Sequence, residues 1–321
     1  MTRDHAGGGG SGRRAGGAGT RRGAGRGGSP SREAYATRRV TFRSDGDACA
    51  GTLYLPASAD DAPVVVMAHG FAAEASFGLE RYAERFAEAG YAALTFDYRG
   101  FDGSEGEAVV LPGRQLDDWH AALDRVDDLD EVGGSRALWG TSLSGGHVIR
   151  VAAERRDVDA VLAQAPFVDG RTLLRTKSKR YLLRAAGAGL RDRVGSLVGR
   201  PHHVKVFGAP DEFAALNEPG AKEGYLRLVP RESRWRNRTP ARTLLALPRY
   251  RPVESAEDVR APTLVVAGTA DAVVPFSAVA GLVEALPDPT LVAKRMGHFD
   301  VHGDAFPELV DHQLAFLRAT L

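Results

Sequence analysis

Short, almost wholly apolar runs alternate along most of this chain with longer segments in which apolar residues recur every three or four positions. A continuous apolar run predicts a strand buried on both faces, and the three-to-four spacing predicts an amphipathic helix. The predicted strands lie near Val64, Ala92, Ala137, Val161, Leu264 and Leu291. The predicted helices span about residues 79–89, 115–129, 146–155, 277–286 and 305–319. This alternation predicts an α/β fold with a doubly wound, mostly parallel sheet.

Residues 38–43 and 48–55 differ from these runs, because apolar and polar side chains alternate there. Alternation is typical of strands with one face in the core and the other in solvent, so we expect an antiparallel hairpin at the sheet edge. The hairpin contains Cys49, the single cysteine, which we expect to be a small buried side chain. One cysteine forms no internal disulfide, and this composition suits a cytoplasmic protein.

Residues 167–251 interrupt the regular alternation between the strand near Val161 and the strand near Leu264. A segment of this length is too long for a structureless loop inside a compact domain. We therefore expect a helical cap inserted into a catalytic domain that comprises residues 34–166 and 252–321. Its larger side chains are expected to form a small core of their own. They include Tyr181, Phe207, Phe213, Tyr225 and Trp235.

The insertion is strongly basic, with 18 Lys and Arg against 7 Asp and Glu in residues 167–250, although the whole chain has a formal net charge of +1. Residues 1–33 carry 7 Arg against 2 acidic residues, which leaves −15 on the rest of the chain. Two interpretations follow. A basic cap would steer an anionic substrate such as a carboxylate or an acyl-phosphopantetheine thioester, or its charge would complement the acidic catalytic domain. The second interpretation is favoured.

Residues 1–33 are almost entirely Gly, Ala, Arg, Ser and Thr, a composition that predicts a disordered tail. No apolar stretch follows its Arg pairs, so neither a Sec nor a twin-arginine signal is indicated. No aromatic residues alternate with the arginines, and we expect no specific nucleic-acid partner. No membrane span is expected either, because no run of about 18 apolar residues occurs.

The chain lacks the spacings H-E-x-x-H, paired C-x-x-C and G-x-x-x-x-G-K, so we expect no metal and no cofactor. The pattern that does carry chemistry is Gly140 to Gly146, which follows a β-prone stretch and precedes a helical one. A sharp strand-to-helix turn with a serine at its tip is a nucleophile elbow, and the serine here is Ser142. Ser144 stands where the G-x-S-x-G pattern has its second glycine. The alternatives are Ser144 as nucleophile and a glycine-rich turn without chemistry.

An acid and a base follow in the order that a serine triad needs, each directly after a predicted strand. Asp271 follows the strand near Leu264, and His298 follows the strand near Leu291. Asp271 would orient His298, which would act as general base toward Ser142. The alternatives are that Asp271 caps the following helix and that His302 is the base. His298 is favoured because it follows a glycine directly after the strand.

Two backbone amides are predicted to form the oxyanion hole, which binds the negative oxygen of a tetrahedral intermediate. One belongs to Leu143, the residue after the nucleophile. The other is assigned to Phe71, because the apolar run 63–68 ends in His69-Gly70-Phe71 and glycine lets the backbone approach a substrate. His69 itself is predicted to have a structural role.

These residues together resemble the α/β-hydrolase superfamily over about residues 38–321. Residues 94–106 look like the strand and D-x-R-G-x-G-x-S loop of many such enzymes, with Asp102 where glycine is common. The arrangement, including residues 164–167 and 297–301, is similar to dienelactone-hydrolase-like and Xaa-Pro-dipeptidyl-peptidase-like serine hydrolases and to polyketide thiohydrolase or transferase relatives. This resemblance implies the α/β-hydrolase fold and an active serine, but no particular substrate.

The function expected from the sequence is a serine hydrolase that cleaves a small-molecule ester or thioester through an acyl-enzyme. One alternative is an acyltransferase or a non-catalytic ligand-binding member of the same fold. A serine peptidase is a subordinate alternative, because nothing in the insertion marks recognition of a free amino terminus. The sequence does not indicate an oligomeric state.

Overall fold

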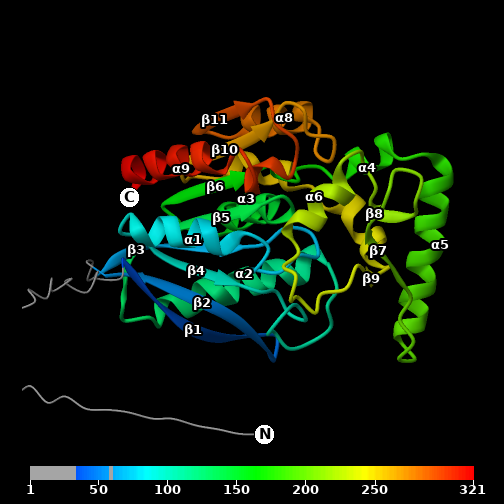
Figure 1. Ribbon diagram of the computed structural model, residues 1–321, viewed down its shortest axis with the longest axis horizontal. Coiled ribbons are helices and arrows are strands. Elements are labelled where there is room, and N and C mark those ends of the chain that lie inside the picture. Colours follow the sequence, from blue (N-terminus) through cyan, green and yellow to red (C-terminus); the bar gives the residue numbers. More distant parts are fainter. Residues whose placement is uncertain (1–33, 58–60) are drawn as a thin grey trace, which may run out of the picture. The chain divides into compact units, whose positions relative to one another are not determined.

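The computed structural model describes residues 34–57 and 61–321, so the predicted tail of residues 1–33 lies outside the described residues (Figure 1). Its main sheet has eight strands in the order β1-β2-β4-β3-β5-β6-β10-β11. They are β1 (Tyr35–Ser44), β2 (Asp47–Pro56), β3 (Ala62–Ala68), β4 (Ala92–Phe96), β5 (Val132–Thr141), β6 (Ala160–Gln164), β10 (Thr263–Gly268) and β11 (Pro289–Lys294). Strand β2 is antiparallel to β1 and β4, and the other neighbouring pairs are parallel. The mostly parallel sheet confirms the predicted fold class.

The hairpin β1–β2 forms at the sheet edge, as its alternating pattern predicts. Its two-residue turn consists of Asp45 and Gly46, both with positive φ, and turns of this kind match the twist of the paired strands. Cys49 of β2 is fully buried.

Helices cover both faces of the sheet (Figure 1). The helices of the body are α1 (Leu79–Glu88), α2 (Pro112–Asp127), α3 (Leu143–Glu154), α8 (Phe276–Ala285) and α9 (Phe306–Thr320), with a short 3-10 helix η3 (Asp300–His302). Side chains of α1 and α9 pack in one core cluster, and side chains of α2, α3 and α8 pack in the other. Successive residues of β3 alternate between the two, with Val64 in one and Val65 in the other. A strand between two helix layers must be apolar on both faces, which explains the continuous apolar runs.

Between β6 and β10 the chain leaves the sheet for residues 167–251, called the insertion here; residues 34–166 and 252–321 are called the body. The insertion contains α4 (Arg171–Thr176), α5 (Lys179–Ser196), β7 (His203–Phe207), β8 (Ala214–Leu216), α6 (Ala221–Leu228), β9 (Thr239–Pro240), α7 (Thr243–Ala246) and the 3-10 helix η1 (Leu247–Arg249), and η2 (Pro252–Asp258) follows it. It gathers beyond the carboxyl ends of β5 and β6 (Figure 1). Within the described residues, no helix has the length and apolar character needed to cross a membrane.

The sequence predicts a helical insertion, and this prediction is wrong in part. The insertion also contains a three-stranded sheet in the order β8-β7-β9. In β7, whose sequence is His-Val-Lys-Val-Phe, polar and apolar residues alternate over the first four positions, and two residues are β-branched. Both features favour a strand. Phe207, Tyr225 and Trp235 form an aromatic cluster with ring centroids 5.0 to 5.9 Å apart. Phe77 of the body contacts two of these rings, so the cluster is shared with the body and is not separate from it.

Candidate active site

Ser142 lies at a sharp turn between β5 and α3, with φ of 56° and ψ of −116°. Left-handed φ is strained for a residue with a side chain, and it is held here because the Ser142 amide donates to the Gln164 carbonyl at 2.8 Å. The turn also brings backbones close together. A Cβ on Gly140 would lie 2.1 Å from the carbonyl oxygen of Ser144, and one on Gly145 would lie 2.8 Å from Cα of Pro166. The second of these close approaches therefore falls on Gly145, which explains why residue 144 can be a serine.

His298 connects Ser142 to Asp271. Nε2 of His298 lies 2.9 Å from Oγ of Ser142, and Nδ1 lies 2.7 Å from Oδ2 of Asp271. The side chains of both His298 and Asp271 are more than nine-tenths buried. An acceptor carboxylate holds the ring proton on Nδ1, which leaves Nε2 free to accept the proton of the serine hydroxyl. The structure thus brings the three sequence-predicted residues into one hydrogen-bonded chain.

Asp271 also holds its own loop in place. Its Oδ1 accepts the amides of Val273 and Val274 at 2.7 and 2.8 Å, while Oδ2 contacts His298. It does not cap α8, which begins at Phe276 without a side-chain cap. These two hydrogen bonds hold the Asp271 carboxylate so that its second oxygen points at the imidazole of His298.

The competing residues lie outside this chain of hydrogen bonds. The buried Ser144 hydroxyl donates to the His69 carbonyl and contacts the Tyr98 hydroxyl. Burial lowers the pKa of His302 to about 4, with a smaller contribution from nearby His298, so its ring is neutral. Nδ1 of His302 has no hydrogen-bond partner among the described residues. Asp300 accepts the amide of Gly297 at 2.8 Å and shapes the turn that carries His298.

Two further histidines are buried in the body. Burial lowers the pKa of His69 to about 4, and its Nδ1 donates to the Gly70 carbonyl at 3.0 Å. The facing Asp97 is also buried, which raises its pKa to about 8. His147 contacts the Tyr250 hydroxyl at 2.6 Å, and burial lowers its pKa to about 3. Neutral, inward-facing rings of this kind serve packing and hydrogen bonding.

The loop after β3 lies directly against Ser142. A Cβ on Gly70 would lie 3.1 Å from Cβ of Ser142 and 3.7 Å from its Oγ, so a side chain there would crowd the hydroxyl. The amides of Phe71 and Leu143 donate to no acceptor in the described part of the chain. Both residues line a cavity that reaches Ser142. These amides are therefore available to a ligand at the serine.

Two aromatic side chains of the insertion hold this loop. The Tyr225 hydroxyl donates to the Phe71 carbonyl at 2.8 Å, and Nε1 of Trp235 donates to the Ala72 carbonyl at 2.8 Å. Ala72 has a positive φ of 50°, so the bonds restrain a strained segment. The sequence predicts both aromatic residues in a small core of the insertion and does not indicate this contact with the body. Nothing in the local sequence marks a bond between residues 154 positions apart.

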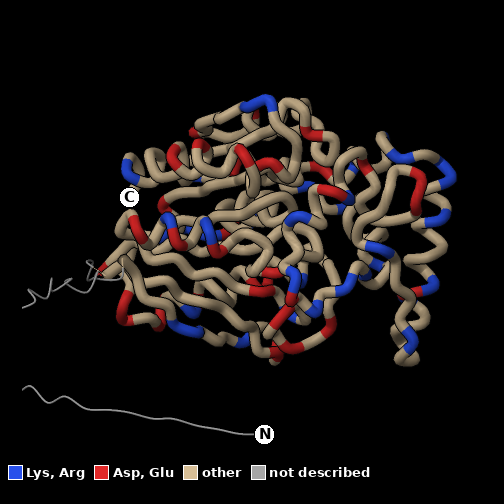
Figure 2. Tube along the Cα trace, viewed as in Figure 1, with Lys and Arg blue, Asp and Glu red and all other residues tan. Residues whose placement is uncertain are grey.

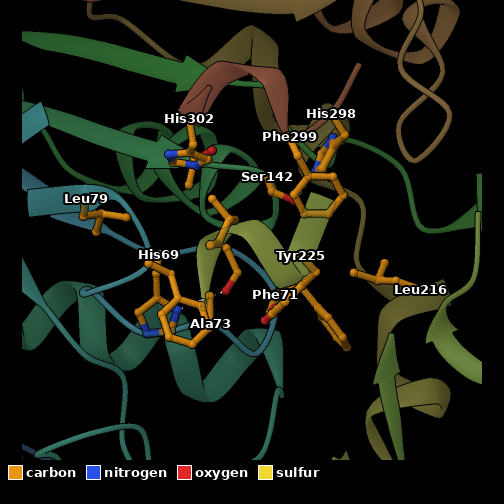
Figure 3. A pocket seen from close by; sticks show the side chains of 14 residues that line it. His69, Phe71, Ala73, Leu79, Ser142, Leu216, Tyr225, His298, Phe299 and His302 are labelled. Carbon is orange, nitrogen blue, oxygen red and sulfur yellow. Dashed lines mark hydrogen bonds between the residues drawn. The ribbon is translucent and has the colours of Figure 1, made fainter. Parts of the chain in front are cut away.

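Two small cavities meet at Ser142. The first, of about 40 Å³, lies between the loop after β3, His302 and the insertion. Figure 3 shows Tyr225 and Leu216 of the insertion facing it together with Ser142 and His298. The second, of about 60 Å³, extends under the insertion and is lined mostly by apolar side chains. They include Leu143, Phe167, Leu173, Leu182, Ala185, Leu244, Leu247 and Val274.

Lys177 and Glu218 are the charged side chains on the wall of the second cavity. They form an ion pair with each other, and the Lys177 ammonium also contacts the Asn217 amide oxygen and lies 5.0 Å from the centre of the Tyr181 ring. Their charges are therefore paired. Among the described residues, no group of three or more His, Cys, Asp or Glu side chains could hold a metal ion.

The amino-acid sequence matches a known protein family and several relatives. The family model for X-Pro dipeptidyl-peptidase (S15 family) matches residues 45–302. Quorum-quenching protein AidA of Acinetobacter baumannii (strain MDR-ZJ06) is 36% identical over 284 residues, which cover 87% of this chain and 93% of AidA. Thiohydrolase aneE of Aspergillus aculeatus is 26% identical over 300 residues, which cover 86% of this chain and 91% of aneE.

The fold is similar to that of a solved hydrolase. The crystal structure of the α/β hydrolase GrgF from Penicillium sp. sh18 has a TM-score of 0.77 and 22% identity, covering 89% of this chain and 99% of that one. At this identity the likeness shows the α/β-hydrolase fold alone.

Proposed function

Since this chain belongs to the S15 family and is an α/β-fold hydrolase, we propose that it cleaves an ester or thioester through an acyl-enzyme on Ser142. The observation that carries the proposal is the hydrogen-bonded chain from Asp271 through His298 to Ser142. Serine, imidazole and carboxylate in this order activate a hydroxyl for attack on a carbonyl carbon.

In the proposed reaction, Nε2 of His298 takes the proton of Ser142 as Oγ bonds to the substrate carbonyl carbon. The amides of Phe71 and Leu143 bind the resulting oxyanion. The tetrahedral intermediate then collapses, the bond to the alcohol or thiol breaks, and His298 returns the proton to that leaving group. Water attacks the acyl-enzyme by the same route, which releases the acid and restores Ser142.

The second cavity supports an apolar acyl group as the substrate part next to Ser142. Its wall is mostly aliphatic, and it is formed largely by the insertion, which we propose acts as a cap. A free amino terminus would need an unpaired carboxylate, whereas Glu218 is paired with Lys177. The proposal therefore favours an ester or thioester over a peptide. The relative named a thiohydrolase supports the thioester as one of the two.

A fluorophosphonate probe and two substrate series test the proposal. We expect wild-type protein to react covalently with the probe and Ser142→Ala to lose both labelling and turnover, because the nucleophile is deleted. Ser144→Ala is the matched control, and it should keep most activity since its hydroxyl contacts His69 and Tyr98. Labelling of Ser142→Ala, or loss of activity in Ser144→Ala alone, would contradict the assignment.

The substrate series compares p-nitrophenyl esters and acyl thioesters of increasing chain length. We expect short and medium acyl groups to be preferred, because the cavity is small. Product analysis separates hydrolysis from acyl transfer: free acid in the absence of an added acceptor supports a hydrolase. A protein that is labelled by the probe but releases product only when a second alcohol, thiol or amine is added would be an acyltransferase.

A further inference from the structure

Helix α5 is the long outer helix of the insertion (Figure 1). It presents apolar side chains to solvent. Leu183, Leu190 and Val194 are 75%, 58% and 67% exposed, and Leu197 directly after the helix is 84% exposed. Their spacing of seven, four and three residues places them on one face. A monomeric protein rarely exposes large apolar side chains in a continuous stripe, so this stripe indicates a binding surface.

The opposite face of α5 packs against the insertion through small side chains. Ala185 and Gly189 are buried, and a Cβ on Gly189 would lie 2.5 Å from Cγ of Leu245. From Leu183 to Leu197, the large apolar side chains therefore point outward and small ones point inward, whereas Tyr181 and Leu182 in the first turn face the second cavity. Over this stretch the helix is the reverse of an ordinary surface helix, whose large apolar residues face the core.

Exposed arginines flank the stripe. Arg184 and Arg191 follow Leu183 and Leu190 by one residue on one side, and Arg193 lies on the other. The one acidic residue of α5, Asp192, is fully buried and binds Arg242. Figure 2 shows basic residues along the length of this helix. The exposed surface of α5 thus combines apolar and cationic groups without an exposed carboxylate of its own.

A basic hollow of about 490 Å³ runs beside α5. It is lined by Arg184 and Arg191 together with His202, His203 and Lys205 from the neighbouring strand segment. The Arg184 guanidinium lies 4.2 Å from the centre of the Phe213 ring, which holds it at the rim. Lys205 is paired with Glu212, whereas no ion pair of Arg184 or Arg191 occurs among the described residues. Two guanidinium groups beside an apolar stripe suit a phosphate group at an apolar boundary.

Three occupants can be compared by charge. Residues 1–33 carry 7 Arg and almost no large apolar residue, so they match neither the charge nor the stripe. A second copy packed stripe to stripe would bring the arginines of two helices together without acidic partners. An anionic lipid surface offers both apolar chains and negative headgroups, which is what a basic amphipathic helix binds.

We propose that α5 docks the protein on an anionic phospholipid surface, with Leu183, Leu190 and Val194 at the acyl boundary and Arg184 and Arg191 at the headgroup phosphates. This surface is distinct from the triad and stands whether or not the proposed reaction is correct. It has a consequence for that reaction, however, because Tyr181, Leu182 and Ala185 on the inner side of the same helix line the second cavity. Docking would place the cavity wall next to lipid, where acylated substrates concentrate.

A dye at position 194 tests the proposal directly. Cys49 is fully buried, so Val194→Cys gives one accessible thiol for an environment-sensitive fluorophore. The control is Leu291→Cys on β11 of the body, where the native side chain is 40% exposed. We expect a blue shift at position 194 with vesicles of phosphatidylcholine and phosphatidylglycerol, a much smaller one with phosphatidylcholine alone, and none at position 291. Absence of the shift at position 194 would overturn the proposal.

Vesicle sedimentation of the full chain gives a second measurement. Replacing Leu190 and Val194 together by Gln should lower partitioning to anionic vesicles by about tenfold, because bound apolar area is lost. Leu291→Gln should bind like wild type, and all three proteins should hydrolyse a small soluble ester equally. The arginine-rich residues 1–33 are common to all three, so a difference reports α5. Equal binding of the double variant and wild type, or a wild-type dimer that the double variant abolishes, would contradict docking on lipid.

Discussion

The body and the insertion differ in where their large apolar side chains lie. Among the described residues, seven of the eight strongly exposed large apolar side chains lie in the insertion, and Leu291 is the one in the body. The body encloses its apolar residues in two clusters on the two faces of the sheet. Helix α5 instead covers the second cavity on one side and faces solvent on the other. The body leaves few large apolar side chains exposed, whereas the outer face of α5 exposes several of them, and this is the face that we propose docks on lipid.

The same difference separates chemistry from access. Ser142, Asp271 and His298 all lie on loops at the ends of body strands, where a packed sheet holds them. The walls of the second cavity come largely from the insertion. Changes in the body should therefore affect the rate of the chemical step. Changes in the insertion should affect which substrates bind in the second cavity and how firmly Tyr225 and Trp235 position the loop after β3.

The largest expected effect tests the body. His298→Ala should lower kcat by about 10⁴-fold for a small ester, because the proposed general base is lost. His302→Ala, on the same segment, should change kcat less than about threefold, since no described partner binds its Nδ1. Steady-state kinetics with thermal melts measure both. Equal losses in the two variants would mean that the imidazole is not assigned correctly.

The double variant Ser142→Ala/His298→Ala sharpens this result. Residues that act as one catalytic unit are not additive, so the second substitution should add little to the first. Independent, multiplying losses would contradict a single hydrogen-bonded unit.

How far the sequence predicts the molecule also differs between the two regions. In the body, helix spacing, apolar strand runs and the serine turn are local patterns, and the strand order around Ser142 then follows from a common topology. The helices start and end within three residues of the expected positions. The parallel sheet and the hairpin around Cys49 formed as predicted. Asp271 and His298 lie in contact, as the sequence predicts. Their catalytic roles stay a prediction.

In the insertion, the decisive contacts connect residues far apart in the chain. The sheet around β7 depends on pairing between short segments of two to five residues. The alternation of polar and apolar residues in such short segments is too brief to be distinguished from the helical patterns around them. The bond from Tyr225 to the Phe71 carbonyl requires the insertion to fold over the body, which no local pattern encodes. The stripe on α5 was equally hidden, because an apolar helix face usually predicts a core contact.

An intermediate effect is expected where the two regions meet. Tyr225→Phe removes the hydroxyl that restrains the Phe71 carbonyl, and it should lower kcat by about tenfold while KM changes little, because a misplaced oxyanion donor weakens transition-state binding. Tyr181→Phe is the control, since its hydroxyl donates to the Ala214 carbonyl inside the insertion. A purely structural role for Tyr225 would lower thermal stability and leave the kcat of the folded enzyme unchanged.

The smallest expected effect concerns the charge of the insertion. Among the described residues, three ion pairs join it to the body: Arg242 with Glu107, Arg227 with Asp300, and Arg251 with Glu254. Of the 18 basic residues in residues 167–250, two, Arg227 and Arg242, therefore form direct ion pairs with the body. The net positive charge of the insertion should attract anionic substrates, so kcat/KM for a carboxylate-bearing ester should fall about two- to threefold as added salt shortens the Debye length from about 30 to 10 Å. A neutral ester of equal size should show no such decline, since steering acts on charge alone. Stopped-flow or initial-rate measurements at low substrate concentration compare the two esters, and an identical salt response for both would contradict steering of the substrate by the charge of the insertion.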